Sequence, residues 1–520
     1  MLMLVYPALF IAAAVGGRKV AEELKPTSKD ELDRMQNEYA SELTKLNPRI
    51  DAINQERQRN LAERKKQLNR YRRPQLRDPV GTLRPTFRNL VLAGGGGKGL
   101  VYPSVYAVLK AAGFMNDITS VAGSSAGALT AAAIACGASP LDVAAVVRNA
   151  RYLGAAVFST SVDGVPPAPQ IYTEQGIDSG QEIYAMFRHL YLVSFRMMAT
   201  ENMGRLEAIR AEGKVTDHDV SLIREIVEGK DATLTFRKLD IMHKANPVVF
   251  KKLTITGSNA ENYKAEFGKL EIRGLFDPID FHAVRVTGQF NTLYFNAETY
   301  PDLEIALAAR MSMSLPALFK AVRFTDISDK DRPRVRLVVD GGVTSNIPVE
   351  IFLPNAAMSR VAAKHLTDSE TYLQMLRDYG DTLVVSPENK AEAASTDKML
   401  TMALNTGKAS STEATLGVTD DVVTNDWEKV FNGGPENVFS VPHGTLSTES
   451  FLTSKAPEIQ QAQLSALVGT IQFCERAVKR RVEELPPHRR ELPEILRLRD
   501  GIIKSKAHRP KPTEPKPRRG

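Results

Sequence analysis

The segment "NLVLAGGGGKGLVYP" (Asn89–Pro103) begins as an apolar run and continues directly into four consecutive glycines. A short apolar run bounded by glycine is typical of a buried strand. Glycines at the end of a strand let the backbone approach a ligand or a reacting group closely. The segment therefore predicts a strand, a loop and a helix in succession, with the loop contacting a phosphate, a dinucleotide or a developing oxyanion.

Six further apolar runs follow and alternate with stretches that favour helix. Such runs, rich in β-branched residues, are typical of buried strands in a largely parallel sheet, so the alternation predicts an α/β fold. Between the first two of them, Ser179–Ala199 favours helix, and we interpret residues 160–230 as a helical insert whose aromatic and methionine stripe packs in a core. The runs are "ITSVAGSS", "KLTITGS", "TLYFNA", "RLVVDGG", "DTLVVSP" and "NVFSVP".

Both ends of the chain are basic and its centre is acidic. Residues 1–85 carry +6 and residues 475–520 carry +8, which leaves −7 for the centre of a chain with net charge +7. We interpret residues 1–85 as an extension containing exposed amphipathic helices and a linker, 86–484 as the α/β domain, and 485–520 as a disordered basic tail rich in proline. Basic ends suit an anionic membrane surface or nucleic acid, and they are as often solvated appendages.

The chain has two cysteines, Cys136 and Cys474, and eight histidines. Two cysteines exclude a disulfide framework and a cysteine-rich zinc site. The histidines do not fall in the spacing of the common zinc motifs, so we expect no metal and no cofactor.

Two phosphate-binding interpretations of the glycine run can be compared with the sequence. A Walker loop needs Ser or Thr after its lysine, whereas Lys98 is followed by Gly99, so this interpretation fails. The dinucleotide fingerprint GxGxxG is present as Gly94, Gly96 and Gly99. It also needs an acidic residue at the end of the second strand, and the nearest acid, Asp117, precedes that strand. A dinucleotide-binding oxidoreductase therefore remains as an alternative.

The second strand ends in "GSSAG" (Gly123–Gly127), which matches the GxSxG nucleophile elbow. Serine on a tight turn between strand and helix projects its hydroxyl, and the small neighbours Gly123 and Gly127 let the turn close. The helix that follows supplies partial positive charge where an oxyanion forms. Ser125 is therefore the candidate nucleophile, and the glycine loop is the candidate oxyanion hole.

Asp340 is the better candidate for the base. His443 has the placement expected of a histidine in a Ser-His-Asp hydrolase, whereas Asp340 lies at the end of the apolar strand "RLVVD", followed by Gly341 and Gly342. A buried carboxylate is costly unless it is paired or functional, and removal from water raises its basicity. The alternative is that Asp340 caps a turn.

GGGxKG, GxSxG and DGG, in that order, resemble the motifs of the patatin-like phospholipase family, and the resemblance extends from about Phe87 to Val482. The loop followed by Tyr and Pro is similar to the branch of secreted bacterial phospholipase toxins. The N-terminal helices and the basic tail match no part of the family. The matching positions are Gly94, Gly95, Gly96, Lys98 and Gly99 in the loop, Gly123, Ser125 and Gly127 in the elbow, and Asp340, Gly341 and Gly342 in the last motif.

The resemblance implies a three-layer α/β/α sandwich and metal-free hydrolysis of glycerophospholipid esters by a Ser125–Asp340 dyad. It implies that the oxyanion hole lies at Gly94–Gly97, and that Lys98, Gly99, Gly341 and Gly342 support the site. The implied partner is a phospholipid membrane, without specific nucleic-acid binding. Toxin-like relatives can also need an activating protein. Residues 1–17 lack charge but are shorter than a typical span of ~20 residues, so membrane association and secretion both stay open.

A third hypothesis is a non-enzymatic adaptor whose basic ends bind a membrane or nucleic acid. It predicts that removal of both ends abolishes function while Ser125→Ala has no effect.

Overall fold

The uncharged stretch 1–17, the first part of the helical insert and the basic tail 485–520 lie outside the residues that the structure describes. The computed structural model of the chain describes residues 29–70, 87–148, 176–272, 279–315, 317–326, 334–352, 382–387, 438–446 and 456–479.

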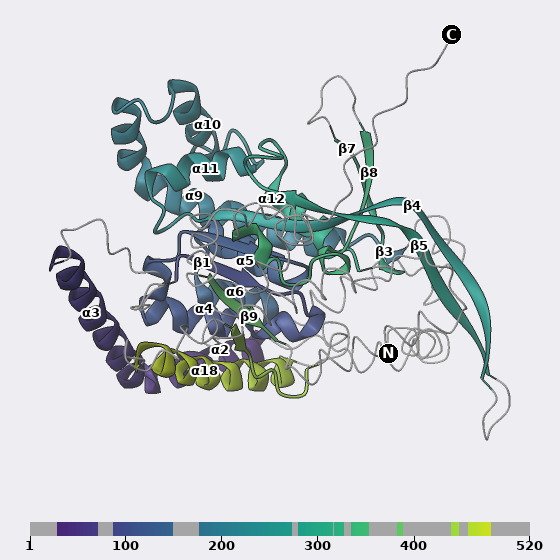
Figure 1. Cartoon of the computed structure of the whole chain (residues 1–520), viewed down its shortest axis with the longest axis horizontal. Coiled ribbons are helices and arrows are strands. Elements are labelled where there is room, and N and C mark those ends of the chain that lie inside the picture. Colours follow the sequence, from purple (N-terminus) through teal and green to yellow (C-terminus); the bar gives the residue numbers. More distant parts are fainter. Residues whose placement is uncertain are drawn as a thin grey trace, which may run out of the picture.

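A mixed sheet forms the centre of the molecule (Figure 1). Five of its strands are parallel neighbours, in the order β10-β9-β1-β2-β4. Strand β8 pairs antiparallel with β4, β7 pairs antiparallel with β8, and β5 pairs antiparallel with β4. This sheet confirms the predicted α/β fold with mostly parallel strands. The strands are β1 (Asn89–Leu92), β2 (Ser120–Gly123), β4 (Lys252–Ile272), β5 (Ile279–Phe295), β7 (Val322–Asp326), β8 (Arg334–Val339), β9 (Thr382–Ser386) and β10 (Val438–Ser440).

Strand β1 is central because its side chains are apolar on both faces. Leu90, Val91 and Leu92 are consecutive, so they point to alternate faces, and all three are buried. Their neighbours β2 and β9 pair with β1 in register from Asn89 onward. Parallel strands that are buried on both faces need this continuous apolar pattern. The carboxyl ends of β1 and β2 therefore lie side by side, and with them the glycine run and the serine motif.

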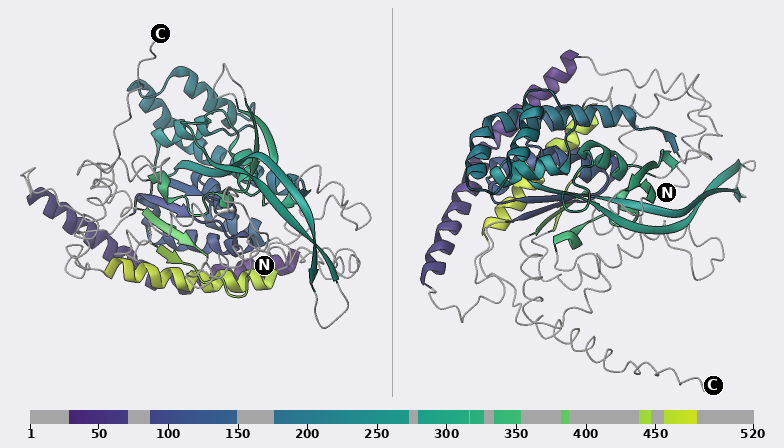
Figure 2. Two further views of the ribbon diagram at one scale, coloured as in Figure 1. Left: turned by 45° about the vertical axis from the view of Figure 1, so that its right-hand side comes forward. Right: turned by 90° about the horizontal axis from the view of Figure 1, so that it is seen from above.

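The helices that the structure describes gather on one face of the sheet (Figure 2). Helix α5 lies directly on β1, β2 and β4, and its alanines from Ala131 to Ala133 are fully buried. The small side chains of α5 allow this close approach. The described residues thus form the sheet and one of the two helical layers that the resemblance implies. The main helices are α4 (Tyr102–Ala111), α5 (Ala126–Ala135), α6 (Pro140–Arg148), α9 (Gln181–Ala211), α10 (Asp217–Val227), α11 (Phe236–Ala245) and α12 (Ile305–Ser312).

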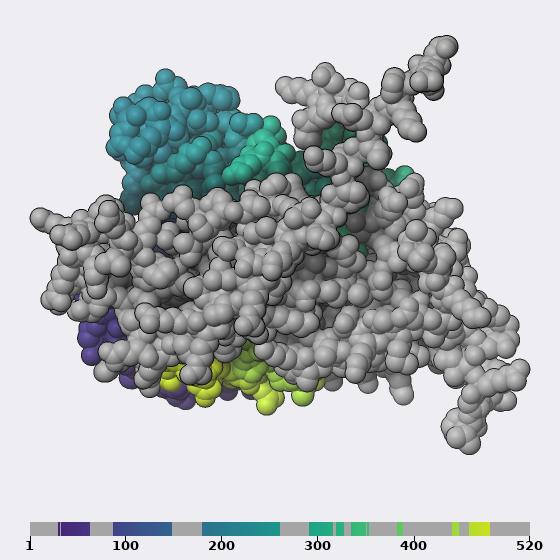
Figure 3. Space-filling view, in the orientation of Figure 1, coloured from purple at the N-terminus to yellow at the C-terminus, as the bar shows by residue number. Residues whose placement is uncertain are grey.

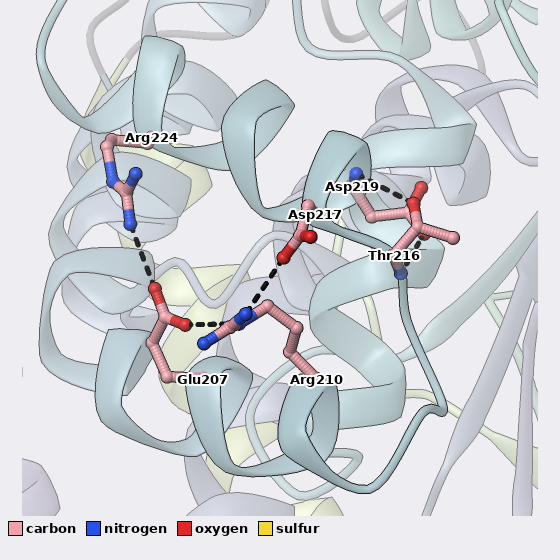
Figure 4. A network of polar contacts seen from close by, with 6 residues as sticks. All are labelled: Glu207, Arg210, Thr216, Asp217, Asp219 and Arg224. Carbon is pink, nitrogen blue, oxygen red and sulfur yellow. Dashed lines mark hydrogen bonds and ion pairs between the residues drawn. The ribbon is translucent and has the colours of Figure 1, made fainter.

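Helices α9, α10 and α11 form a lobe at the upper left of the molecule (Figure 3). The predicted core face of α9 is buried at Ile183, Phe187 and Tyr191, whereas Met197 is half exposed. The turn between α9 and α10 carries ion pairs and a capping box (Figure 4). The network comprises Arg210 with Glu207 and Asp217, Arg224 with Glu207, and Thr216 with Asp219.

The N-terminal helices α2 (Lys29–Lys45) and α3 (Asn47–Arg70) pack against the C-terminal helix α18 (Ala456–Lys479). The sequence predicts exposed helices, but Met35 and Tyr39 are buried. The surface that buries them is formed by α18 and α4, from distant parts of the sequence. Polar contacts also join these elements: Arg49 with Glu475 at 2.9 Å, Asn60 with the carbonyl oxygen of Val478 at 2.9 Å, Gln460 with Glu38 at 2.8 Å, and Tyr39 with Ser104 at 3.0 Å.

Strands β4 and β5 continue beyond the sheet as a long two-stranded hairpin (Figure 1). The sequence runs "KLTITGS" and "TLYFNA" mark only the parts of these strands nearest the body. No helix among the described residues is long and apolar enough to span a membrane.

Candidate active site

Ser125 occupies a sharp turn between β2 and α5. Its backbone has φ 51° and ψ −123°, and it is the one non-glycine residue of the described ranges with positive φ. A residue with a side chain in this region costs about 1 to 3 kcal/mol, so the surrounding structure must hold it there.

The two glycines of the elbow allow the turn to close. A Cβ at Gly123 would lie 2.5 Å from the carbonyl oxygen of Gly127. A Cβ at Gly127 would lie 2.1 Å from the carbonyl oxygen of Leu92, at the end of β1. Any side chain at either position would push α5 away from the sheet. The backbone amide of Ser125 donates to the hydroxyl of Ser312 at 2.9 Å, which fixes the turn from a third side.

The hydroxyl of Ser125 donates to Oδ2 of Asp340 at 2.7 Å. Asp340 follows β8, which pairs antiparallel with the part of β4 that extends beyond β2: Val339 lies opposite Ser258, three residues past the partner of Gly123, so β8 ends near the carboxyl ends of β1 and β2. The other carboxylate oxygen, Oδ1, accepts the amide of Gly342 at 2.7 Å. Asp340 therefore caps the turn that follows it and contacts Ser125 at the same time.

The backbone of Asp340 is held on both sides. Its amide donates to the carbonyl oxygen of Ser314 at 2.9 Å, and its carbonyl oxygen accepts the hydroxyl of Ser258 at 2.7 Å. The residue is 3% exposed. Burial raises the pKa of its carboxyl from 3.8 to about 7, although the hydrogen bonds from Ser125 and Gly342 oppose the rise. A carboxylate with a pKa near neutrality suits a general base.

The glycine loop lies beside Ser125 and is fixed by two other loops. The Gly94 amide donates to the carbonyl oxygen of Asn346 at 3.0 Å, and a Cβ at Gly94 would lie 2.2 Å from Asn346 Oδ1. A Cβ at Gly95 would lie 2.5 Å from Cγ of Pro387, which follows β9. Among the described residues, none accepts a hydrogen bond from the amides of Gly95, Gly96 or Gly97.

The remaining candidate residues pack around this centre. Lys98 is buried, and its amide donates to the carbonyl oxygen of Gly95 at 3.1 Å. A Cβ at Gly99 would lie 2.6 Å from the Cβ of Ala126, so this glycine lets the loop contact the start of α5. A Cβ at Gly341 would lie 2.5 Å from the carbonyl oxygen of Thr256, and one at Gly342 would lie 2.8 Å from Asn346 Oδ1.

No local sequence pattern points to Ser258 or Ser312, although each contacts a candidate catalytic residue. Ser312 lies in "RMSMS" (310–314), where no local pattern indicates which hydroxyl faces Ser125. His443 follows β10, but the hydroxyl of Ser125 donates to Asp340 instead. In the part of the chain that the structure describes, no three His, Cys, Asp or Glu residues are grouped so that they could hold a metal ion.

A sequence profile described as "Patatin-like phospholipase" matches residues 90–353. The matched region begins in β1 and ends just after the loop that carries Asn346, so it includes Ser125 and Asp340. Comparison with the curated proteins gave no match.

Solved structures to which the fold is similar include bacterial and human proteins. VipD from Legionella pneumophila is 16% identical with a TM-score of 0.39, and the alignment covers 76% of this chain and 67% of VipD. ExoU, in its complex with SpcU from Pseudomonas aeruginosa, is 18% identical with a TM-score of 0.40, with 82% and 59% covered. Human GIVD cytosolic phospholipase A2 is 12% identical with a TM-score of 0.30, with 83% and 67% covered. The chain thus spans less than two thirds of ExoU.

Proposed function

This chain belongs to the patatin-like phospholipase family, and from that premise we propose that it is a lipid acyl hydrolase that cleaves fatty-acyl esters of glycerophospholipids. The observation that carries the proposal is the 2.7 Å hydrogen bond from Ser125 Oγ to the buried carboxylate of Asp340. The nearby amides of Gly95, Gly96 and Gly97, which have no acceptor among the described residues, support it.

In the first half of the reaction, Ser125 Oγ attacks the ester carbonyl carbon while Asp340 accepts the hydroxyl proton. The carbonyl oxygen becomes an oxyanion, and the amides of Gly95, Gly96 and Gly97 stabilise it. One such donor contributes about 2.7 to 4 kcal/mol to the lowering of the barrier. The bond to the glycerol oxygen then breaks. Asp340 returns its proton to that oxygen, and the acyl group stays on Ser125.

In the second half, Asp340 accepts a proton from water as the water oxygen attacks the acyl carbonyl carbon. The bond from Ser125 Oγ to the acyl carbon breaks, Oγ takes the proton back, and the fatty acid leaves. Asp340 thus alternates between base and acid, and a pKa of about 7 allows both roles near neutral pH.

Gly94 has a different role from the other loop glycines in this proposal. Its amide already donates to Asn346, so it is not free to donate to an oxyanion. We therefore assign the oxyanion donors to Gly95, Gly96 and Gly97, and the placement of the loop to Gly94.

The test is release of free fatty acid from phospholipid vesicles by wild type, Ser125→Ala and Asp340→Asn. We expect each substitution to lower kcat at least 10³-fold. Ser124→Ala is the matched control, because it removes the adjacent buried hydroxyl, which has no hydrogen-bond partner among the described residues. Activity of either variant close to wild type would refute the mechanism.

A fluorophosphonate label, detected by intact mass, measures reactivity of the serine without assuming a lipid substrate. ExoU occurs in a complex with SpcU in one of the similar structures. We propose that this chain too can require a protein partner, so labelling is measured with and without cell extract. Labelling of wild type but not of Ser125→Ala is the expected result. Labelling that appears only with extract would support the partner.

A further inference from the structure

The short segment 310–314 contacts both candidate catalytic residues. The hydroxyl of Ser312 accepts the backbone amide of Ser125 at 2.9 Å, and the carbonyl oxygen of Ser314 accepts the amide of Asp340 at 2.9 Å. Ser312 and Ser314 are fully buried. One segment, far in sequence from the elbow, therefore holds the backbones of the two residues between which the proton moves.

The contact with Ser312 matters because of the backbone conformation of Ser125. At φ 51° the chain leaves β2, and the Ser125 amide is not part of the ladder that pairs Gly123 with its neighbours. Ser312 Oγ is its hydrogen-bond acceptor. The bond is part-buried, and an amide that loses its acceptor in such surroundings is costly, so removal of that hydroxyl favours relaxation of the turn toward an ordinary conformation. Relaxation would move Ser125 Oγ away from Asp340.

Arg310 fixes the segment against the body of the protein. The guanidinium donates from Nε and Nη2 to the carbonyl oxygen of Ser179, at 2.9 and 2.7 Å, and from Nη1 to Ser314 Oγ at 2.7 Å. It is 4% exposed, and a Cβ at Gly180 would lie 2.3 Å from its Nε. A buried cation with these partners rigidifies the segment, so the position of Ser312 Oγ is well defined.

We propose that Ser312 is a positioning residue, whose hydroxyl holds the backbone of Ser125 in the conformation that places Oγ on Asp340. The inference rests on the proposed function, because it assumes that Ser125 is the nucleophile. Ser312 contacts neither of the reacting groups, and it acts through the Ser125 amide.

The test compares Ser312→Ala with Ser312→Thr and with a matched control. Ser104→Ala is that control, because Ser104 is also fully buried and its hydroxyl also makes a side-chain hydrogen bond, to Tyr39, away from the site. We expect Ser312→Ala to lower kcat for a soluble ester about 10- to 100-fold, or about 1.4 to 2.7 kcal/mol in activation free energy, with KM unchanged. Ser312→Thr keeps an acceptor and recovers most of the rate. We expect Ser104→Ala to keep kcat within about threefold of wild type, even if its unfolding temperature falls as far as that of Ser312→Ala.

Two results separate this inference from the proposed function. If wild type hydrolyses ester but Ser312→Ala and Ser104→Ala have the same kcat, or if Ser312→Thr is as slow as Ser312→Ala, the positioning role is wrong and the proposed function stands. If wild type neither hydrolyses ester nor takes up fluorophosphonate, the proposed function falls first and this inference with it.

Discussion

The backbone amide of Gly94 donates to the carbonyl oxygen of Asn346 at 3.0 Å, across two loops that follow different strands. This bond joins the glycine loop to the loop that begins at Asp340. A Cβ at Gly94 would meet both Asn346 Oδ1, at 2.2 Å, and the Cβ of Ser125, at 3.2 Å. The donor loop, the nucleophile and the loop that follows the base thus meet at Gly94, where a side chain fits only if a neighbour moves.

Gly94→Ala should therefore lower kcat/KM at least 100-fold, measured with a soluble ester. The added methyl group would displace the Asn346 side chain and, with it, the donor loop or Ser125, and small displacements of reacting groups cost about this much. Adding Asn346→Ala to the Gly94→Ala variant removes the closest clash, so the double variant should regain part of the activity. A Gly94→Ala enzyme with normal kinetics would show that the loop yields without affecting the chemistry.

The pH dependence of kcat/KM should report the carboxyl of Asp340. Its pKa is raised to about 7 by burial, and the base must be ionised to accept the proton of Ser125. We expect kcat/KM to be constant above pH 8 and to fall about tenfold per pH unit well below pH 7. Rates of fluorophosphonate labelling should follow the same curve. A rate that stays constant down to pH 5 would mean that a different group accepts the proton.

Asp340→Asn should unfold at a higher temperature than wild type at pH 8. In the folded protein the carboxyl has a pKa of about 7 instead of 3.8, so wild type loses stability as the pH rises through this window. At 1.36 kcal/mol per pKa unit, the full effect is about 4 kcal/mol above pH 7 and close to zero at pH 4. Thermal unfolding at both pH values checks this. Equal gains at pH 4 and pH 8 would contradict the assignment to ionisation.

Two glycines should respond in opposite ways to alanine. Gly204 is exposed within α9, and a Cβ there meets nothing within 4 Å, so Gly204→Ala should stabilise the protein by about 0.5 to 1 kcal/mol. Gly127→Ala places a methyl group 2.1 Å from the carbonyl oxygen of Leu92 and should destabilise by several kcal/mol or prevent folding. Urea unfolding measures both. Equal midpoints would show that α5 shifts freely on the sheet.

The strands and the local motifs could be predicted because they depend on short patterns. Apolar runs bounded by glycine identified β1, β2, β8 and β9, and the GxSxG spacing marked the turn at Ser125. The structure also brings together Ser125 and Asp340, each of which was a candidate because of its own local motif. Their roles in catalysis stay a proposal until the variants are measured.

Such patterns do not predict whether neighbouring strands are parallel or antiparallel, or which distant elements pack together. A single apolar run does not indicate whether its neighbour is parallel, so the antiparallel β8 and the long pairing of β4 with β5 were not anticipated. The contact of Ser312 with Ser125 joins residues far apart in the sequence, and nothing near either residue indicates it. In the same way, Met35 and Tyr39 are buried by a helix at the other end of the chain.

That last contact sets the order in which the molecule can be completed during synthesis. Helices α2 and α3 leave the ribosome before α18, so the surface of α18 on which they pack is translated after them. Until α18 emerges, the apolar side of α2 lacks the part of its packing surface that α18 supplies, so we expect Met35 and Tyr39 to be more exposed in a nascent chain than in the folded protein. A stop codon before Ala456 would remove α18 and with it that part of the surface.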